Sequence, residues 1–192
     1  MLFNQAFDQF MARSNAASRR VATLGPNGTS SYTAAVHFAK TYPSSILLFP
    51  TYEDAADAVR SAPRDSALVV ANAYASINRF YISHALSPIG AFFKDTPAYV
   101  VAAFDDDALD DADVTIASHP APQHLIAHLA ARPNVTILDA DSTHQAAALV
   151  AEGKARACLT TRIAADLVEL KTLDVVIQTI PMLWTVFASK EH

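Results

Sequence analysis

Short apolar runs alternate with longer amphipathic segments along most of this chain. The apolar runs are often β-branched and short, which is typical of strands buried on both faces. The expected strands are 21–24, 46–49, 68–70, 99–103, 114–117, 135–138, 157–160 and 175–178. Apolar residues recur at helical spacing in 32–40, 53–61, 123–131, 144–152 and 163–170. This alternation predicts an α/β fold class with largely parallel sheets.

The first nineteen residues carry a pattern of their own. Six apolar residues follow helical spacing, namely Leu2, Phe3, Ala6, Phe7, Phe10 and Met11. Segment 1–19 is therefore predicted to be an amphipathic arm that packs on the body or on a second subunit. Asp8 argues against a transit peptide, and the segment lacks the basic start and apolar centre of a secretory signal. No apolar run approaches the roughly 18 residues of a membrane span, so we expect a cytoplasmic protein.

Composition narrows the classes of partner. The chain has 192 residues, 52% hydrophobic and 17% charged, which predicts one compact domain or two small lobes and excludes a disordered chain. The net charge of −5 is concentrated in segment 105–113, which holds six aspartates and no Lys or Arg. That segment is read as a surface loop in preference to a metal site. The rest is nearly neutral, which disfavours nucleic acid and leaves room for a small anionic ligand.

The segment 25–31, GPNGTSS, holds two of the four glycines in the chain. Glycine suits a backbone with positive φ or a close approach to a ligand, and here a strand enters the loop and a helix leaves it. A helix start of this kind offers hydroxyls and free N–H groups to a carboxylate or phosphate. The alternative is an ordinary capped turn, and the segment is neither a Walker loop nor a GxGxxG fingerprint.

Two further helix starts carry hydroxyl residues. Ser142 with Gln145 three residues on forms a capping box, and Gly153 stands where a C-terminal cap belongs, which predicts a helix over 143–152. In the third start Ser118 is the expected cap, and Pro120 stands in the first turn, where its missing N–H costs little. Capping alone explains Ser142. Three such starts, each soon after a strand, also suit a ligand with two carboxylates.

Other reactive side chains give weaker signals. His119 could act as an acid or base near neutral pH. His124 and His128 are i,i+4, but HLIAH lacks the glutamate of HExxH, so no metal is expected. Cys158, the single cysteine, is expected to be inert core and cannot form an internal disulfide. Trp184, the only tryptophan, is either core filler or an apolar wall for an unsaturated ring.

Six short motifs, taken in order, resemble those of the prephenate dehydratase family. They are GPNGTSS at 25–31, ANAYAS at 71–76, SHPAP at 118–122, STHQAA at 142–147, ACLTT at 157–161 and TVF at 185–187. The resemblance implies a periplasmic-binding-protein type II-like fold with two α/β lobes and a ligand cleft between the lobes. It places lobe 1 at 20–97 plus 178–192 and lobe 2 at 98–177. The regulatory domain that usually follows the last motif in that family is not expected here.

Two motifs depart from the dehydratase pattern. Asn72-Ala73-Tyr74 stands where the family has Glu-Asn-Ser, and Thr185-Val186-Phe187 stands where it has Thr-Arg-Phe. In the dehydratase the threonine helps the C4 hydroxyl to leave and the arginine holds a substrate carboxylate. Because valine cannot replace a planar guanidinium with five donors, efficient aromatising dehydration is not expected.

The chain is more similar to a branch of this superfamily, the non-aromatising prephenate decarboxylases of bacilysin and related antibiotic pathways. The shared segments are 23–31, 72–74 with Ile77, Phe80 and Tyr81, 95–99, 118–122 with Leu125 and Ile126, 142–143, and 180–187. Asn72 stands where the branch has histidine. The resemblance implies decarboxylation of prephenate to a dihydro-4-hydroxyphenylpyruvate in natural-product biosynthesis.

The expected site follows from these motifs. The expected catalytic residues are Thr185, Asn72, Tyr74 and His119. The expected substrate-binding residues are Gly28, Thr29, Ser30, Ser118, Ser142, Thr143, Thr160, Trp184, Arg79 and Arg162, with Lys94 as a further candidate cation. The 25–31 and 142–143 segments would each hold one carboxylate, and Thr185 would lie on the hydroxyl side of the ring. The three cations could equally be surface charges.

Several alternatives stay open at this point. The chain could be a dehydratase that forms phenylpyruvate, a decarboxylase for a prephenate analogue, or a divergent binder of a small anionic cyclohexadiene-type acid. No metal or organic cofactor is expected, because prephenate carries its own electron sink. The expected partner is a small dianionic substrate, with no nucleic acid and no membrane, and a homodimer is left open.

Overall fold

The structure, a computed structural model, describes residues 1–190 and divides the chain into two compact units. Unit 1 comprises Met1–Thr96 and the segment that starts at Pro181, and unit 2 comprises Pro97–Ile180. The chain therefore passes from one unit to the other twice. The expected ligand cleft between the lobes stays a prediction, and each unit is described by itself.

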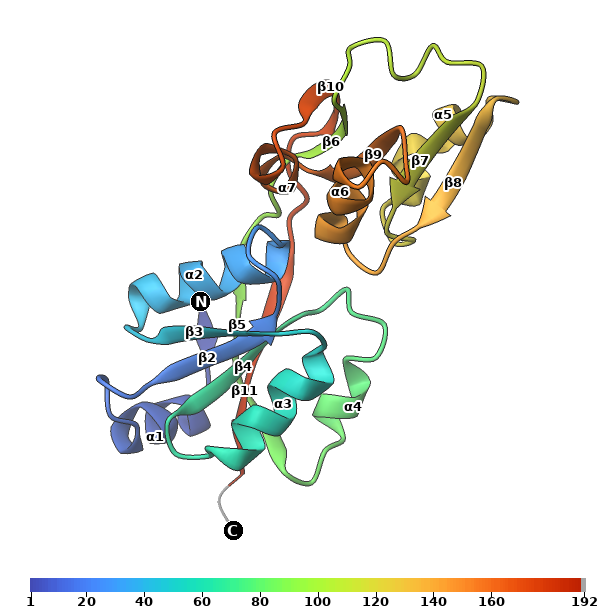
Figure 1. The fold of residues 1–192 in the computed structure, drawn as a ribbon. Coiled ribbons are helices and arrows are strands. Elements are labelled where there is room, and N and C mark those ends of the chain that lie inside the picture. The colour runs from blue at the N-terminus through green and yellow to red at the C-terminus, as the bar shows by residue number, and fades with distance from the viewer. Residues whose placement is uncertain (191–192) are drawn as a thin grey trace. The chain divides into compact units, whose positions relative to one another are not determined.

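Unit 1 is a six-stranded mixed sheet with helices on both faces (Figure 1). Its elements are β1 (Leu2–Phe3), α1 (Gln5–Arg13), β2 (Arg20–Leu24), α2 (Ser30–Thr41), β3 (Ser45–Phe49), α3 (Tyr52–Ser61), β4 (Ser66–Ala71), α4 (Asn78–Tyr81), β5 (Leu86–Phe93) and β11 (Leu183–Ser189). The strand order is β1-β5-β11-β4-β2-β3. β2 runs parallel to β3 and β4, whereas β11 runs antiparallel to β4 and β5.

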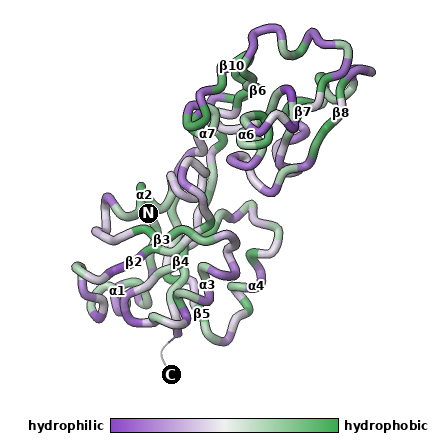
Figure 2. Tube along the Cα trace, in the orientation of Figure 1, coloured by the Kyte–Doolittle hydropathy of each residue, from purple (hydrophilic) through white to green (hydrophobic). Residues whose placement is uncertain are grey.

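The central strand β4 shows why this sheet needs cover on both faces. Its alternate residues belong to two different cores: Val69 packs with α1 and α2, and Val70 packs with α3 and α4. All of β4 except Ala71 is buried. A strand that is covered on both faces in this way requires an uninterrupted apolar run in the sequence. Figure 2 shows hydrophobic residues along the strands of this sheet.

Strand β5 is a long strand of unit 1 that the apolar pattern did not predict. It contains Pro88 and Gly90, both of which are unfavourable inside strands. The pairing with β11 is irregular at this point, because Val186 lies opposite Gly90 and Phe187 lies opposite Pro88. The irregularity accommodates the proline, which has no N–H to give to a regular ladder.

The N-terminal arm belongs to unit 1. β1 pairs antiparallel with β5, and α1 buries Phe7 and Phe10 against the first core. Phe3 stacks on Phe7 with ring centroids 3.8 Å apart. Gly90 makes this contact possible, because a Cβ there would lie 2.0 Å from Phe3 Cδ1. The amphipathic pattern of 1–19 is thus satisfied within the chain.

Unit 2 is a five-stranded mixed sheet with the order β10-β6-β9-β7-β8. Its elements are β6 (Tyr99–Ala103), β7 (Val114–Ser118), the 3₁₀ helix η1 (Gln123–Ile126), α5 (Ala127–Ala130), β8 (Val135–Asp139), α6 (Thr143–Ala151), β9 (Ala157–Thr161), α7 (Arg162–Leu167) and β10 (Lys171–Ile177). Strands β8, β7 and β9 are parallel, and β6 is antiparallel to β9 and β10.

Two expected helices of unit 2 are shorter or less regular than predicted. The segment 123–131 forms a 3₁₀ turn followed by one α-helical turn. The cap expected at Ser118 is wrong, because Ser118 is the last residue of β7 and the 3₁₀ turn begins only at Gln123, after Pro122. The helix expected over 163–170 ends at Leu167, because Glu169 adopts a φ of 58° that no helix continues through. The error in 163–170 is at a helix end, where apolar spacing carries little information.

The acidic segment 105–113 finds its counter-charges elsewhere in unit 2. Arg156 makes ion pairs with Asp105 and Asp111, each at 2.6 Å, and Lys171 pairs with Asp106 at 2.8 Å. Within the described residues no group of three or more His, Cys, Asp or Glu is placed to hold a metal ion. No helix in the same part of the chain is long and apolar enough to cross a bilayer.

Gly90→Ala is expected to destabilise unit 1 by about 1–3 kcal/mol, because the new methyl group overlaps the Phe3 ring. Urea denaturation of the variant measures this cost. Phe3→Ala removes the ring, so the double variant should lose less stability than the two single variants added together. Strict additivity of the two losses would contradict the contact.

Candidate active site

The parallel strands of unit 1 end at a common edge of the sheet, here called edge 1. Strands β2, β3 and β4 end there at Leu24, Phe49 and Ala71, and β11 begins there, since Trp184 lies opposite Ala71. Loops at the carboxyl ends of parallel strands are the usual ligand sites of open α/β sheets. Six of the expected site residues lie at edge 1: Gly28, Thr29, Ser30, Asn72, Tyr74 and Thr185.

Thr185 forms the centre of a hydrogen-bonded group at edge 1. Its Oγ1 lies 2.8 Å from Asn72 Oδ1, to which it donates, and 2.7 Å from the hydroxyl of Tyr81. Thr185 is 3% exposed, and the backbone N–H of Asn72 donates to the carbonyl of Leu183 at 2.9 Å. Two expected catalytic residues, Thr185 and Asn72, are therefore in direct contact.

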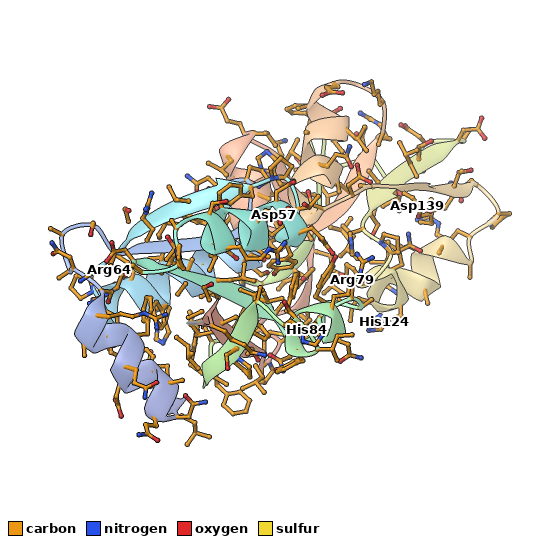
Figure 3. All side chains as sticks on the ribbon, turned by 90° about the horizontal axis from the view of Figure 1, so that it is seen from below. Asp57, Arg64, Arg79, His84, His124 and Asp139 are labelled. Atoms are coloured by element: carbon orange, nitrogen blue, oxygen red, sulfur yellow. The ribbon has the colours of Figure 1, made fainter. Side chains whose placement is uncertain are left out.

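Tyr74 belongs to a second group at the same edge. Its hydroxyl donates to both carboxylate oxygens of Glu53, at 2.9 and 3.0 Å, and Arg79 pairs with Glu53 at 3.3 Å. Burial, and then the hydrogen bond to Glu53, raise the pKa of Tyr74, so the phenol stays protonated. Arg79 lies on the short helix α4 (Figure 3), and its side chain is 69% exposed. The pair with Glu53 therefore contributes little stability.

Several polar groups of the loop 25–31 make hydrogen bonds that hold the loop and the start of α2 in place. Gly28 adopts a φ of 86°, as expected for a glycine at this turn. The Thr29 hydroxyl accepts from the N–H of Tyr32 at 3.1 Å and so caps α2, while Ser31 bonds the hydroxyl of Tyr52 at 2.7 Å. Ser30 and the first N–H groups of α2 are left for a ligand.

Unit 2 has a corresponding edge, here called edge 2, where β7, β8 and β9 end at Ser118, Asp139 and Thr161. Figure 3 labels Asp139 at the end of β8. The expected site residues of unit 2 all lie at this edge: Ser118, His119, Ser142, Thr143, Thr160 and Arg162.

Hydrogen bonds within unit 2 engage most hydroxyls of edge 2. Ser118 Oγ donates to the carbonyl of His119 at 2.9 Å, and Thr160 Oγ1 donates to the carbonyl of Thr143 at 2.5 Å. Ser142 Oγ accepts from the N–H of Gln145 at 3.0 Å, which confirms the predicted cap of α6. The Thr143 hydroxyl and the N–H groups of the first turn of α6 remain for an anion.

His119 is neutral near pH 7 in this setting. Burial lowers its pKa, and the nearby carboxylates of Asp141 and Asp139 offset the effect only in part. Its Nδ1 accepts a hydrogen bond from the N–H of Ala121 at 3.2 Å. The ring proton is therefore on Nε2, so His119 can donate one hydrogen bond but is a poor proton source at neutral pH.

Trp184 lies in the core of unit 1 and not at a surface. It is 1% exposed, packs in the same cluster as Val186 and Phe92, and its indole N–H donates to the carbonyl of Lys94 at 2.9 Å. Of the two roles weighed for Trp184, this position is that of core filler. The other role, an apolar wall for a substrate ring, stays a prediction. Cys158 is also core, and burial raises its pKa to about 12, which confirms an inert thiol.

Two residues at edge 1 were not expected from the sequence as site residues. Glu53 was read only as part of a helix, and Tyr81 only as part of a family motif. The sequence gives no signal for Tyr81 as a site residue, because its hydrogen-bond partner Thr185 is 104 positions away in the chain. Within the described residues Lys94 and Arg162 make no ion pair, so their charges are available to an anion.

Solved structures with the same fold include a prephenate dehydratase and a periplasmic substrate-binding protein. The prephenate dehydratase of Arthrobacter aurescens in complex with L-Phe has a TM-score of 0.70 at 18% identity, over 90% of this chain and 61% of that chain. A periplasmic substrate-binding protein of an ABC transporter from Coxiella burnetii has a TM-score of 0.57 at 16% identity, over 88% and 84%. At such identities the likeness shows the fold alone. This chain spans about three fifths of the dehydratase chain.

Sequence comparison is more specific than the fold. The model of the family described as prephenate dehydratase matches residues 21–189, and the chain therefore belongs to the prephenate dehydratase family. A prephenate decarboxylase from Bacillus subtilis (strain 168) is 35% identical over 178 residues, which cover 87% of this chain and 85% of that protein. A prephenate decarboxylase from Planktothrix agardhii is 30% identical over 181 residues, which cover 88% of each chain.

The free energy of unfolding is expected to fall as the pH drops from about 7 to about 5. The pKa values of His119 and His37 are both lowered, His37 by burial and then by Lys94 and Lys40, so the unfolded chain takes up protons before the folded chain does. Denaturation curves across this range test the sign. His119→Gln and His37→Gln should each flatten the slope, and a variant with the wild-type slope would contradict the assignment for that histidine.

Proposed function

We propose that this protein decarboxylates prephenate without aromatising the ring. The relatives named prephenate decarboxylase, at 30–35% identity over most of both chains, support this reaction. The observation that carries the choice over dehydration is the residue after Thr185. Val186 occupies the position of the motif arginine, and it is fully buried in the apolar core of unit 1, where no guanidinium is available to a substrate.

The reaction breaks one carbon–carbon bond and forms one carbon–hydrogen bond. The bond from the ring to its carboxylate breaks, CO₂ leaves, and the electron pair is delocalised over the diene. One proton then adds to a ring carbon, and the C4 hydroxyl is retained. Because the substrate supplies its own electron sink, the step needs no cofactor, and the protein contributes binding, desolvation and control of protons.

Edge 1 is proposed to handle the ring and its hydroxyl. Thr185 and Asn72 supply polar atoms within a mostly apolar surrounding, and Tyr74 supplies a neutral phenol beside them. Ser30 and the first N–H groups of α2 are proposed to receive one carboxylate. The Thr29 hydroxyl contributes indirectly, since it caps the helix whose N–H groups would bind.

Edge 2 is proposed to hold a carboxylate through groups that are not used inside the unit. These are the Thr143 hydroxyl, the N-terminal N–H groups of α6, the Nε2–H of His119 and the guanidinium of Arg162. Ser118, Ser142 and Thr160 act on this edge by fixing the loops, because each is bonded to backbone. A cation and a helix N-terminus together favour the charged form of an acid.

Purified protein incubated with prephenate is expected to release CO₂ and to form a product that keeps the ring hydroxyl. Chromatography and mass spectrometry against authentic phenylpyruvate identify the product. Phenylpyruvate as the main product would establish a dehydratase instead. No turnover, together with no thermal shift at millimolar prephenate, would indicate a binder of a different anion.

Arg162→Ala is expected to raise KM for prephenate by about 10-fold or more, because one hydrogen bond to a charged group contributes about 1.5–3 kcal/mol. Lys154→Ala is the matched control, since it removes one exposed cation of unit 2 that precedes β9 and lies away from edge 2. Initial rates over a range of prephenate concentrations give both values. Equal KM values for the two variants would remove Arg162 from the site.

A further inference from the structure

The hydrogen bonds around Thr185 define where its single hydroxyl hydrogen lies. Asn72 Oδ1, 2.8 Å from Thr185 Oγ1, is a carbonyl oxygen and can only accept. The Thr185 hydrogen is therefore directed at Asn72. The Tyr81 hydroxyl, 2.7 Å from the same Oγ1, must then be the donor in its own bond. The three residues form a chain of donors that runs from Tyr81 to Thr185 to Asn72.

This direction limits what Thr185 can offer to a substrate. With its hydrogen held by Asn72 and one lone pair held by Tyr81, Thr185 Oγ1 presents only an acceptor. A leaving hydroxyl requires the opposite, a donor that neutralises the charge developing on oxygen as the carbon–oxygen bond breaks. Thr185 can thus accept a hydrogen bond from a substrate hydroxyl, and it cannot protonate that hydroxyl.

The surrounding structure holds both partners of Thr185 in place. Asn72 follows β4 directly, and its N–H bonds the carbonyl of Leu183 on β11 at 2.9 Å. Tyr81 ends α4, and its ring contacts the ring of Phe187 edge to face, with centroids 5.0 Å apart. Phe187 is two residues after Thr185 on the same face of β11. The strand β11 therefore positions both the Thr185 hydroxyl and the Phe187 ring, and this ring supports Tyr81, the donor to Thr185.

We propose that Asn72 is a specificity-determining residue and Tyr81 a positioning residue, which together keep the C4 hydroxyl on the ring during decarboxylation. The inference rests on the proposed function and adds a reason for its outcome. In the dehydrating route the electron pair from the lost carboxylate expels hydroxide from C4, and a donated proton converts it to water. In the route proposed here that donor is absent at Thr185, so the pair stays in the diene and a ring carbon takes up the proton.

The test is the ratio of phenylpyruvate to the hydroxyl-retaining product, because a ratio does not depend on the fraction of folded enzyme. Asn72→Ala removes the acceptor and should raise this ratio about tenfold or more. Asn72→Ala with Tyr81→Phe should raise it further, since Thr185 then has no other acceptor in the group. Adding Thr185→Val to the double variant should return the ratio to the wild-type value, because the new donor is removed.

Asn72→Asp is the matched control. Both of its carboxylate oxygens accept, so the Thr185 hydrogen stays engaged and the ratio should remain that of the wild type. Asn72→Leu serves as a second, shape-matched variant that also lacks the acceptor. If Asn72→Ala and Asn72→Leu raise the product ratio equally, the cause is the lost acceptor and not the cavity that alanine leaves.

The outcomes distinguish this inference from the proposed function. If the wild type releases CO₂ but the double variant forms no more phenylpyruvate than the wild type does, the inference is wrong and the decarboxylase stands. If Asn72→Ala and Asn72→Leu are folded and form no product, Asn72 is needed for decarboxylation itself and the inference is also wrong. If the wild type releases no CO₂ from prephenate, the proposed function fails and the inference fails with it.

Discussion

The antiparallel pairing of β11 with β4 is the interaction on which edge 1 depends. It inserts the last strand of the chain between β4 and β5 and sets Thr185 opposite Val70, so that Thr185 reaches Asn72 across 113 positions of sequence. The backbone ladder defines the register, and the alternation of side chains then sends Trp184 and Val186 into one core and Thr185 and Phe187 toward the other side. A slip of one residue would put the indole of Trp184 in the place of the Thr185 hydroxyl.

Hydroxyl residues in this protein serve mainly to build the loops that present backbone groups. Thr29 and Ser142 cap α2 and α6, and Ser118 and Thr160 donate to carbonyls of neighbouring loops. The remaining N–H groups at such a helix start have no partner within the helix and carry partial positive charge, which suits an anion. The motifs rich in Ser and Thr thus use several of their hydroxyls for local structure.

The sequence predicted the α/β class, most strands and the cap of α6, because each of these depends on residues close together in the chain. It did not predict β5, where Pro88 and Gly90 mask a strand that exists through its pairing with β11. Among site residues, the motifs indicated both edges, and the structure then placed Trp184 in the core of unit 1. The motifs gave no role to Glu53 or Tyr81, since neither has a partner nearby in sequence.

By itself, the sequence determined most of the strands and helices, the cap of α6, and which position of the dehydratase motif lacks arginine. Only the tertiary structure decided that Thr185 donates to Asn72 and accepts from Tyr81, and that Tyr74 is bonded to Glu53. The physical reason is the range of the interactions. Apolar periodicity and capping act within a few residues of the chain, whereas a hydrogen bond requires two atoms within about 3 Å, a distance that only the packing of distant strands can set.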